Sequence, residues 1–277
     1  KLNIPFVSST TTFAFNKESA KVMQGSLKDL FKVLIQMGKA QKHIKRLQEN
    51  GYDIKNVIEI IQNDNDTNTI VYTSPEFQPY SDTFSDKYIF VGPSIRPKND
   101  AFEKTREKVV YISMGTVNND MTPFYKNCID ALKDSDYQVV LSVGSQVDIK
   151  HLEEYVIKSE SNAQFQVFPY VNQIAVLEKA DAFLTHCGMN SVSEALYFKV
   201  PLVMYPQTNE QKGVAFRVNE LEAGLYLSGD SILEIRIALK DVLQQSKYKE
   251  QATVISNSFS KCGGSKAAVE KILDVCS

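Results

Sequence analysis

The chain has 277 residues, 43% of them hydrophobic and 23% charged, and its 31 basic and 33 acidic residues give a net charge of −2. This length favours about two globular domains, and the balanced charge gives no indication of a nucleic-acid partner. No apolar run approaches the roughly 18 residues that a membrane helix needs, so we expect no membrane association.

The chain begins in a segment that is typical of the junction between a helix and a strand. Leu2 to Val7 has the pattern of a helix end that leads into a core strand, with Pro5 as the first residue of that strand. Because a domain does not begin in the middle of such a unit, the sequence predicts that the first domain is incomplete.

An amphipathic helix is predicted between Val22 and Leu47, because apolar residues recur there at steps of three and four. Gly51 follows it and is typical of a helix C-terminus. The basic residues in the second half of this helix allow two interpretations. One is a membrane-surface or substrate-contacting helix; the other, which we favour, is a core-packed helix with a solvated basic end.

Two short strands are predicted next, at residues 70–73 and 88–91, with several prolines around them. Gly92 to Lys108 is rich in proline and charge and has no apolar periodicity, which predicts an interdomain linker. The expected organisation is therefore a first domain at residues 1–97, a linker at 98–108 and a second domain at 109–277.

Strands and helices alternate regularly after the linker. Alternation of this kind predicts an α/β domain with a parallel sheet and helices on both faces. The tail from Ile232 to Cys276 is expected to be helical in three pieces, broken near Ser246 and at Gly263-Gly264. Strands are predicted at residues 109–113, 138–143, 165–168, 182–185, 202–205 and 225–227, and helices at residues 123–132, 149–158, 172–179, 191–198 and 211–222.

The four cysteines are scattered and form neither a CxxC pair nor a metal-binding spacing. In a chain of this size they indicate reduced, packed thiols and a cytoplasmic setting.

The segment from Ala182 to Gln211 has the features of a phosphate site. In an open parallel sheet, ligands bind beyond the carboxyl ends of the strands, where the next helix begins, and a helix start favours an anion. His186, Gly188, Asn190 and Ser191 follow the predicted strand at 182–185. The alternative for His186 is a core histidine with satisfied hydrogen bonds.

Two other strand ends carry a glycine next to a hydroxyl residue. Gly115 and Thr116 follow the first strand of the second domain, and Gly144 and Ser145 follow its second strand. Each pair is either a simple turn or a place where the backbone approaches a phosphate, and the residues alone leave both interpretations open.

The ordered motifs of this segment resemble those of a known family. The string His186-Cys187-Gly188-Met189-Asn190-Ser191-Val192-Ser193-Glu194-Ala195-Leu196, followed by Val200-Pro201-Leu202 and Glu210-Gln211, resembles the donor signature of family 1 glycosyltransferases. Within that family it is most similar to the bacterial macrolide glycosyltransferase branch. The resemblance implies a GT-B fold of two Rossmann-like domains, with an incomplete N-terminal acceptor domain and a complete C-terminal domain for the UDP-sugar.

The resemblance also implies roles in nucleotide binding. Tyr170, Val171 and Gln173 match a Trp-x-Pro-Gln stretch that cradles uracil, in which the aromatic ring stacks on the base for roughly 1–3 kcal/mol. Tyr and Asn at positions 170 and 172 depart from that pattern, which bears on base preference. Gly115 and Thr116 match a glycine–hydroxyl pair near the phosphates. The alternative for Tyr170 is packing against the core.

Two acidic positions match residues that hold sugar hydroxyls in the family. Glu194 matches the acid that binds the ribose, although Ser191 to Glu194 is also a capping-box pattern that would tie Glu194 to the helix start. Glu210 and Gln211 match the pair that grips the transferred sugar, a task that suits a carboxylate beside a carboxamide. The alternative for this pair is the acidic first turn of a helix.

The chemistry implied by the resemblance is transfer of a hexose, glucose by preference, from a UDP-sugar to a hydroxyl of a small lipophilic acceptor. It implies inversion at the anomeric carbon and no metal or other cofactor. The charge on the departing diphosphate would be met by fixed donors at the helix start and at Thr116 and His186. The family's general base is a histidine near the start of the acceptor domain. Neither His43 nor His151 matches it, so no catalytic residue is assigned.

The main alternative is a nucleotide-sugar-binding remnant without transferase activity, because the general base is absent from this sequence. A UDP-sugar epimerase of the same architecture is disfavoured, because the patterns at Tyr170–Gln173 and Glu210-Gln211 belong to the transferases. A dinucleotide-dependent dehydrogenase is disfavoured, because no GxGxxG follows the first strand of the second domain.

Overall fold

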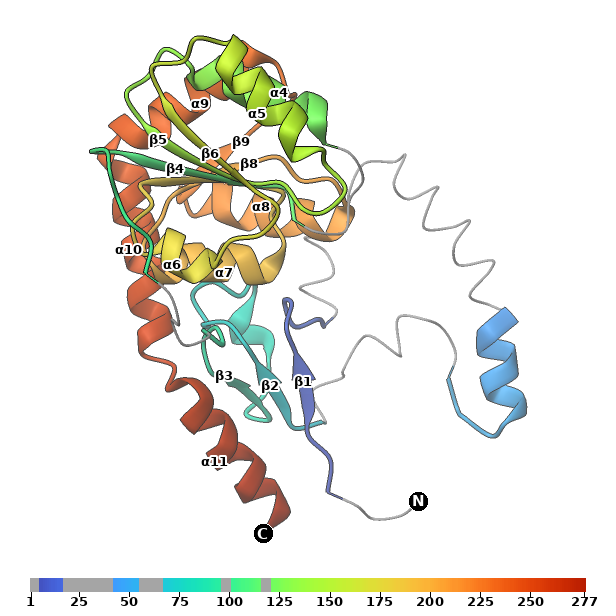
Figure 1. Ribbon diagram of the computed structural model, residues 1–277. Helices are drawn as coiled ribbons and strands as arrows, with labels where there is room; N and C mark the ends of the chain where they lie inside the picture. Colours follow the sequence, from blue (N-terminus) through green and yellow to red (C-terminus); the bar gives the residue numbers. More distant parts are fainter. Residues whose placement is uncertain (1–4, 17–41, 55–66, 96–100, 116–120) are drawn as a thin grey trace. The chain divides into compact units, whose positions relative to one another are not determined.

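The computed structural model describes residues 5–16, 42–54, 67–95, 101–115 and 121–277 (Figure 1). By its internal contacts the chain divides into two compact units, Lys1–Gly92 together with Lys261–Ser277, and Pro93–Ser260. None of the described helices has the length and apolar content to cross a membrane.

The first unit contains a three-stranded parallel sheet in the order β1-β2-β3. Its strands are β1 (Ser8–Thr10), β2 (Thr69–Val71) and β3 (Tyr88–Phe90), with a short 3-10 helix, η1 (Ser81–Thr83), before β3. The two later strands confirm the predicted ones. The first strand begins at Ser8 and not at Pro5, because Pro5 has no N–H for the ladder and the pairing starts with the bond from Ser8 N to Asn68 O (2.8 Å).

The helix predicted between Val22 and Leu47 falls mostly outside the described residues. Residues 42–49 are helical, and Gly51 follows with a φ of 84°. Its N–H donates to Gln48 O at 2.9 Å, which is the expected glycine C-terminus.

The last helix, α11 (Gly264–Cys276), has its contacts in the first unit. Gly264 donates its N–H to Val91 O at 2.9 Å, and Ala268 packs with Ile70 and Val91. Gly263 and Gly264 have φ values of 81° and 61°, which lets the chain turn sharply between two helices. The sequence analysis expects this helix in the second domain, because the pattern at the two glycines shows the break but not the direction the chain takes after it.

The second unit is built on a six-stranded parallel sheet in the order β6-β5-β4-β7-β8-β9. This is the doubly wound order, in which the chain starts in the middle of the sheet and grows first to one side and then to the other. The strands are β4 (Val109–Ser113), β5 (Gln138–Ser142), β6 (Gln164–Phe168), β7 (Ala182–Thr185), β8 (Leu202–Met204) and β9 (Gly224–Tyr226), each within one residue of its predicted bounds.

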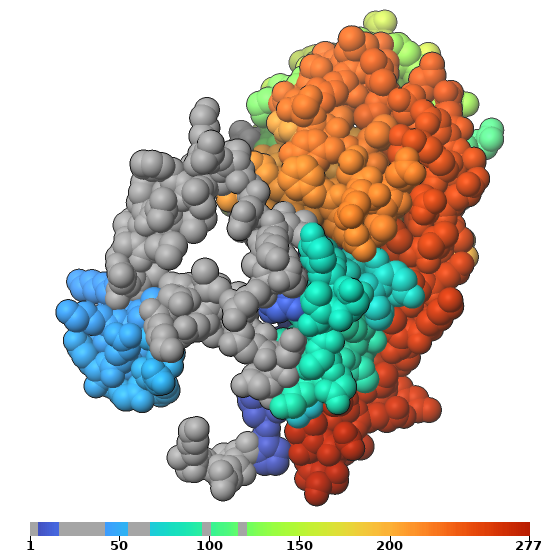
Figure 2. Space-filling view, turned by 180° about the vertical axis from the view of Figure 1, so that it is seen from behind, coloured from blue at the N-terminus to red at the C-terminus, as the bar shows by residue number. Residues whose placement is uncertain are grey.

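Helices cover both faces of this sheet, as the alternation predicts. Figure 1 shows α4, α5 and α9 on one face and α6, α7 and α8 on the other. Figure 2 shows the opposite side of the molecule, where the orange surface of this unit belongs to the chain beyond about residue 200. The bounds are α4 (Thr122–Leu132), α5 (Ile149–Lys158), α6 (Gln173–Leu177), α7 (Met189–Tyr197), α8 (Asn209–Glu220), α9 (Ile232–Gln244) and α10 (Ser246–Ser260).

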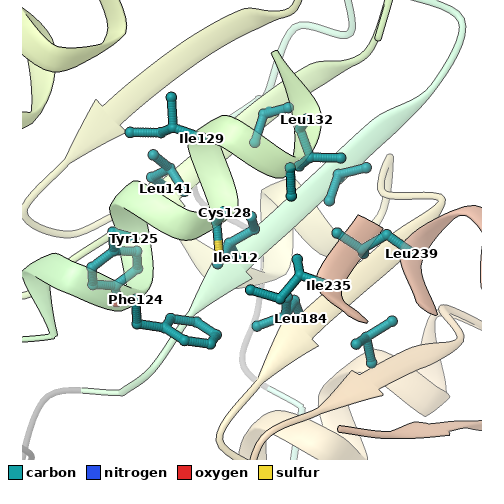
Figure 3. Close-up of a cluster of buried hydrophobic side chains, with 14 of the residues drawn as sticks. Ile112, Phe124, Tyr125, Cys128, Ile129, Leu132, Leu141, Leu184, Ile235 and Leu239 are labelled. Atoms are coloured by element: carbon teal, nitrogen blue, oxygen red, sulfur yellow. The ribbon is translucent and has the colours of Figure 1, made fainter. Parts of the chain in front are cut away.

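The main core lies between the sheet and the α4–α9 face (Figure 3). Alternate residues of the strands, such as Ile112 and Leu184, point toward Ile129 of α4 and Ile235 of α9, and all four are fully buried. Because side chains alternate along a strand, the neighbouring positions of β4, which carry Tyr111 and Ser113, face α6 and α7. Both faces of the sheet are therefore packed, and the face toward α6 and α7 also carries the hydroxyl groups of Tyr111 and Ser113.

Candidate functional site

The order of the strands creates a switch point between β4 and β7. The chain leaves β4 toward β5 and leaves β7 toward β8, so the two loops diverge at the carboxyl end of the sheet, which is where open sheets of this kind bind ligands. The two strands pair directly, with Ser113 opposite Thr185. Gly115 and His186, which follow these residues, are therefore neighbours, although 71 residues separate them in the sequence.

The imidazole of His186 is packed against two glycines. A Cβ atom added to Gly115 would lie 2.7 Å from Cε1 of His186, and one added to Gly188 would lie 2.9 Å from Nε2. Gly115 also has a φ of 79°, a conformation that side chains rarely adopt. A side chain at either position would therefore force the imidazole ring to shift.

His186 is half-buried, and burial lowers its pKa, an effect that the backbone of Ser113 partly offsets. Its Nδ1 is buried and has no hydrogen-bond partner among the residues that the structure describes. Nδ1 thus lacks the hydrogen bond that a satisfied core histidine would make, although the backbone of Ser113 provides a hydrogen bond to the ring. The ring is neutral at neutral pH, and one nitrogen carries a proton that it can donate.

The helix that follows, α7, begins at Met189, two residues earlier than predicted, with Gly188 as its N-cap. The first helical bond runs from Val192 N to Gly188 O (3.0 Å). Met189 is buried and Asn190 is exposed, so burial of an apolar side chain in the first turn accounts for the earlier start. The backbone N–H groups of this first turn have no acceptor within the helix.

The earlier start excludes one of the two interpretations of Glu194. Ser191 lies inside the helix, no side chain caps the helix start, and the capping-box alternative is therefore wrong. Instead, Oε2 of Glu194 accepts a hydrogen bond of 2.5 Å from Nε2 of Gln173, which also lies 3.3 Å from Oγ of Ser191. Three of the predicted nucleotide-binding residues thus form one network between α6 and α7.

Tyr170 lies on the loop before α6, and 56% of it is exposed, so packing against the core does not hold it. Val171 beside it is half-buried. Asn172 is the N-cap of α6, and its Oδ1 accepts from Ala175 N at 3.3 Å. A capping side chain therefore occupies the position where the family pattern has proline.

The pair Glu210 and Gln211 lies in the first turn of α8. Oε1 of Gln211 accepts from the backbone N–H groups of Thr208 (3.1 Å) and Gln207 (2.7 Å), and Thr208 Oγ1 accepts from Gln211 N (3.3 Å). This capping box holds the carboxamide by its oxygen and leaves its amide hydrogens as the group that can donate. Glu210 is exposed.

For two other positions that the sequence singled out, the structure gives no evidence of a role in binding. Gly144, with a φ of 79°, donates its N–H to Pro169 O at 3.0 Å, which is an ordinary bridge between loops. Thr116 lies outside the described residues. Among the residues that the structure does describe, no three His, Cys, Asp or Glu side chains are grouped so as to hold a metal ion.

Two tyrosines that bond to groups of this region were not singled out from the sequence, Tyr111 in β4 and Tyr125 in α4. The hydroxyl of Tyr125 on α4 accepts from Met114 N (3.2 Å) and donates to Ser142 O (3.2 Å), which links the ends of β4 and β5. The hydroxyl of Tyr111 donates to Oε1 of Gln173 at 3.1 Å. For Tyr111 a signal was present, because it is a phenol in an otherwise aliphatic strand, two residues before Ser113.

Comparison with known proteins agrees with this geometry. Residues 96–260 match the family described as UDP-glucoronosyl and UDP-glucosyl transferase. The uncharacterized UDP-glucosyltransferase YojK of Bacillus subtilis (strain 168) is 36% identical over 285 residues, which cover 99% of this chain and 68% of that protein.

Two solved structures have the same fold. The glycotransferase of kitacinnamycin has a TM-score of 0.81 and 24% identity, and the match covers 98% of this chain and 71% of that one. CalG4, the calicheamicin glycosyltransferase, has a TM-score of 0.78 and 26% identity over 98% of this chain and 68% of that one. The likeness confirms the predicted GT-B type of α/β architecture. The chain therefore belongs to family 1 of the glycosyltransferases, the UDP-glycosyltransferases, and to their bacterial macrolide-glycosyltransferase-like branch.

Proposed function

We propose that the second unit is the donor-binding domain of an enzyme that transfers a hexose from a UDP-sugar to a hydroxyl group of a small lipophilic acceptor. Glucose is the first candidate, because the relative YojK is described as a UDP-glucosyltransferase. The observation that carries the proposal is the meeting of Gly115, His186, Gly188 and the start of α7 at the switch point of the sheet.

The diphosphate is proposed to bind at this switch point. The N–H groups in the first turn of α7 and the helix dipole favour an anion there, and Asn190 and Ser191 add side-chain donors. The neutral imidazole of His186 supplies one more N–H, and the glycines at 115 and 188 let the backbone come close. Fixed donors of this kind stabilise the negative charge that develops on the departing UDP.

The nucleoside is proposed to bind over the loop before α6. Tyr170 is 56% exposed and has a free ring face for the uracil, and the backbone at Val171 would read the edge of the base. Glu194, oriented by Gln173, is the proposed partner of the ribose hydroxyls, because a carboxylate can accept from two hydroxyls at once. Glu210 and the amide hydrogens of Gln211 are the proposed partners of the transferred sugar.

We propose a single displacement without a resident metal. The acceptor oxygen forms its bond to the anomeric carbon while the bond from that carbon to the diphosphate oxygen breaks. UDP leaves with the bonding electrons, and the configuration of the sugar is inverted. The proton of the acceptor hydroxyl passes to a general base.

No described residue is assigned as that base. His151 lies on α5, with Nε2 2.7 Å from Lys126 Nζ, and His43 lies in the helix at residues 42–49. Neither follows a strand of the six-stranded sheet. This observation favours a second candidate function, namely binding of a nucleotide-sugar without transfer by the chain as given.

One experiment separates the two candidates. The chain is titrated by calorimetry with UDP, UDP-glucose and dTDP-glucose, and it is then assayed for product by mass spectrometry with a panel of lipophilic alcohols, with and without EDTA. Binding with EDTA-resistant transfer supports the enzyme, and binding without transfer supports the second candidate. If the chain gives a cooperative melt by circular dichroism but binds neither UDP nor UDP-glucose, both are refuted.

A further inference from the structure

A buried tyrosine in the sheet, Tyr111, forms a hydrogen bond to a residue of the proposed ribose site. Tyr111 is in the middle of β4, is only 1% exposed, and stacks on Phe183 of β7 with a centroid distance of 4.6 Å and an interplanar angle of 15°. The stack fixes the ring, so the hydroxyl is held at one place on the face that carries α6 and α7. There it lies 3.1 Å from Oε1 of Gln173.

The hydrogen bonds around Gln173 have only one consistent direction. An ionised carboxylate can only accept, so the atom of Gln173 that lies 2.5 Å from Glu194 Oε2 has to be the amide nitrogen. The carboxamide oxygen then faces Tyr111, and the tyrosine hydroxyl has to be the donor. Burial raises the pKa of Tyr111 to about 12, so the hydroxyl keeps its proton at neutral pH.

Without this hydroxyl, the carboxamide loses the hydrogen bond that anchors it from the β4 side. A flipped Gln173 would turn its oxygen toward the carboxylate of Glu194, and two acceptors would then face each other. The carboxylate of Glu194 therefore selects the orientation of Gln173, and the Tyr111 hydroxyl, as donor to the opposite end, holds the carboxamide in place against Glu194 and Ser191.

We propose that Tyr111 is a positioning residue for ribose recognition, which acts through Gln173 to orient the carboxylate of Glu194. The proposal rests on the proposed function, since it takes Glu194 as the partner of the ribose hydroxyls. Tyr111 itself is too deeply buried to touch the nucleotide. Its effect is therefore expected to be largest for ligands that carry both ribose hydroxyls, which distinguishes it from a general contribution to the fold.

The test compares UDP with 2′-deoxy-UDP by calorimetry. The wild-type chain is expected to prefer UDP. Tyr111→Phe keeps the stack on Phe183 and removes one neutral hydrogen bond, so the affinity for UDP should fall by about 3- to 10-fold. The affinity for 2′-deoxy-UDP, which offers Glu194 only the 3′-hydroxyl, should fall by a smaller factor, so that the preference shrinks. Adding Tyr111→Phe to Glu194→Ala should not reduce the preference further.

Two further variants protect the test. Tyr155→Phe is the matched control, because its hydroxyl donates to Asp130 Oδ2 (2.7 Å) between α4 and α5 and has no link to Gln173; it should leave the preference unchanged. Gln173→Met removes the hydrogen bonds between Tyr111 and Glu194 at a half-buried position. It replaces Tyr111→Phe in the titration if that variant unfolds at too low a temperature.

The outcomes separate this inference from the proposed function. A folded wild-type chain that does not bind UDP refutes the proposed function. A wild-type chain that binds UDP and 2′-deoxy-UDP equally refutes the ribose role of Glu194. Two results refute the positioning role alone when the wild type prefers UDP. In one, Tyr111→Phe keeps that preference; in the other, it weakens the binding of both ligands by the same factor.

Discussion

Gly188→Ala is expected to weaken UDP binding through the side chain of His186 and not through the backbone. Gly188 has a φ of −60° and a ψ of 133°, which alanine adopts without strain. The new Cβ would lie 2.9 Å from Nε2 and 3.3 Å from Cε1 of the imidazole, so the ring has to move by about 0.5 Å to reach an ordinary contact. The ring also lies close to Gly115, where an added Cβ would be 2.7 Å from Cε1.

The magnitude follows from these contacts. Overpacking of this kind costs about 1–3 kcal/mol of stability. If the displaced imidazole no longer donates to the diphosphate, the loss of one hydrogen bond to a charged group weakens binding by about 1.5–3 kcal/mol. This corresponds to a dissociation constant for UDP that is about 10- to 150-fold higher.

A double-mutant cycle with His186→Ala tests the mechanism. When the ring is absent, the alanine at 188 has nothing to displace, so it should change the affinity by less than about twofold and cost little stability. Gly229→Ala is the control, because its Cβ would meet only Glu234 Oε2 at 3.2 Å, and it should leave UDP binding unchanged. The affinities are measured by calorimetry and the stabilities by urea unfolding. Wild-type affinity in Gly188→Ala, or an equal loss in the His186→Ala background, would refute the reasoning.

Three further predictions concern the same site. Gln211→Glu keeps the oxygen that caps α8 but removes the amide hydrogens, so its melting temperature should match that of the wild type while its affinity for UDP-glucose falls about fivefold. Gln211→Ala removes the whole carboxamide and should lower both the melting temperature and the affinity. If the two variants have the same melting temperature and the same affinity, the donor role of the amide is contradicted. Tyr170→Ala should raise the dissociation constant of UDP by about 5- to 150-fold, as expected for the loss of base stacking, with no change in the melt because the ring is exposed; an unchanged affinity would remove its role in stacking. The lowered pKa of His186 means that the unfolded chain binds a proton that the folded chain does not, so the free energy of unfolding should fall as the pH drops below about 6.5. Urea unfolding at several pH values should show a smaller fall for His186→Gln, and an identical pH dependence in both proteins would argue against the buried neutral imidazole.

The elements of the second unit followed from local patterns in the sequence. Its four inner strands, β4, β5, β7 and β8, are short runs that are buried on both faces, and the helices between the strands have apolar positions at steps of three and four, so each of these elements is specified within its own length. The location of the site followed as well, because ligands of a parallel sheet bind where the strands end. His186, Gly188 and Glu194 could be singled out on these grounds together with the family motif.

What the sequence could not provide was the set of partners that residues have across the fold. Ser191 to Glu194 has a local capping pattern, but Glu194 bonds to Gln173, 21 residues earlier, because α6 and α7 pack side by side on the sheet. The place of α11 depends in the same way on contacts with Ile70 and Val91 that lie far away in the chain.

The role of the glycines was also decided by the tertiary structure. A sequence motif indicates that Gly115 and Gly188 are needed, but the reason, an imidazole packed against both, exists only because β4 and β7 are neighbours in the sheet. The hydrogen bond from Tyr111 to Gln173 likewise depends on the fold, because the two residues are far apart in the sequence. Local patterns determine which elements form, whereas the pairing of elements distant in sequence determines which side chains meet, because that pairing depends on the free energy of packing the whole domain.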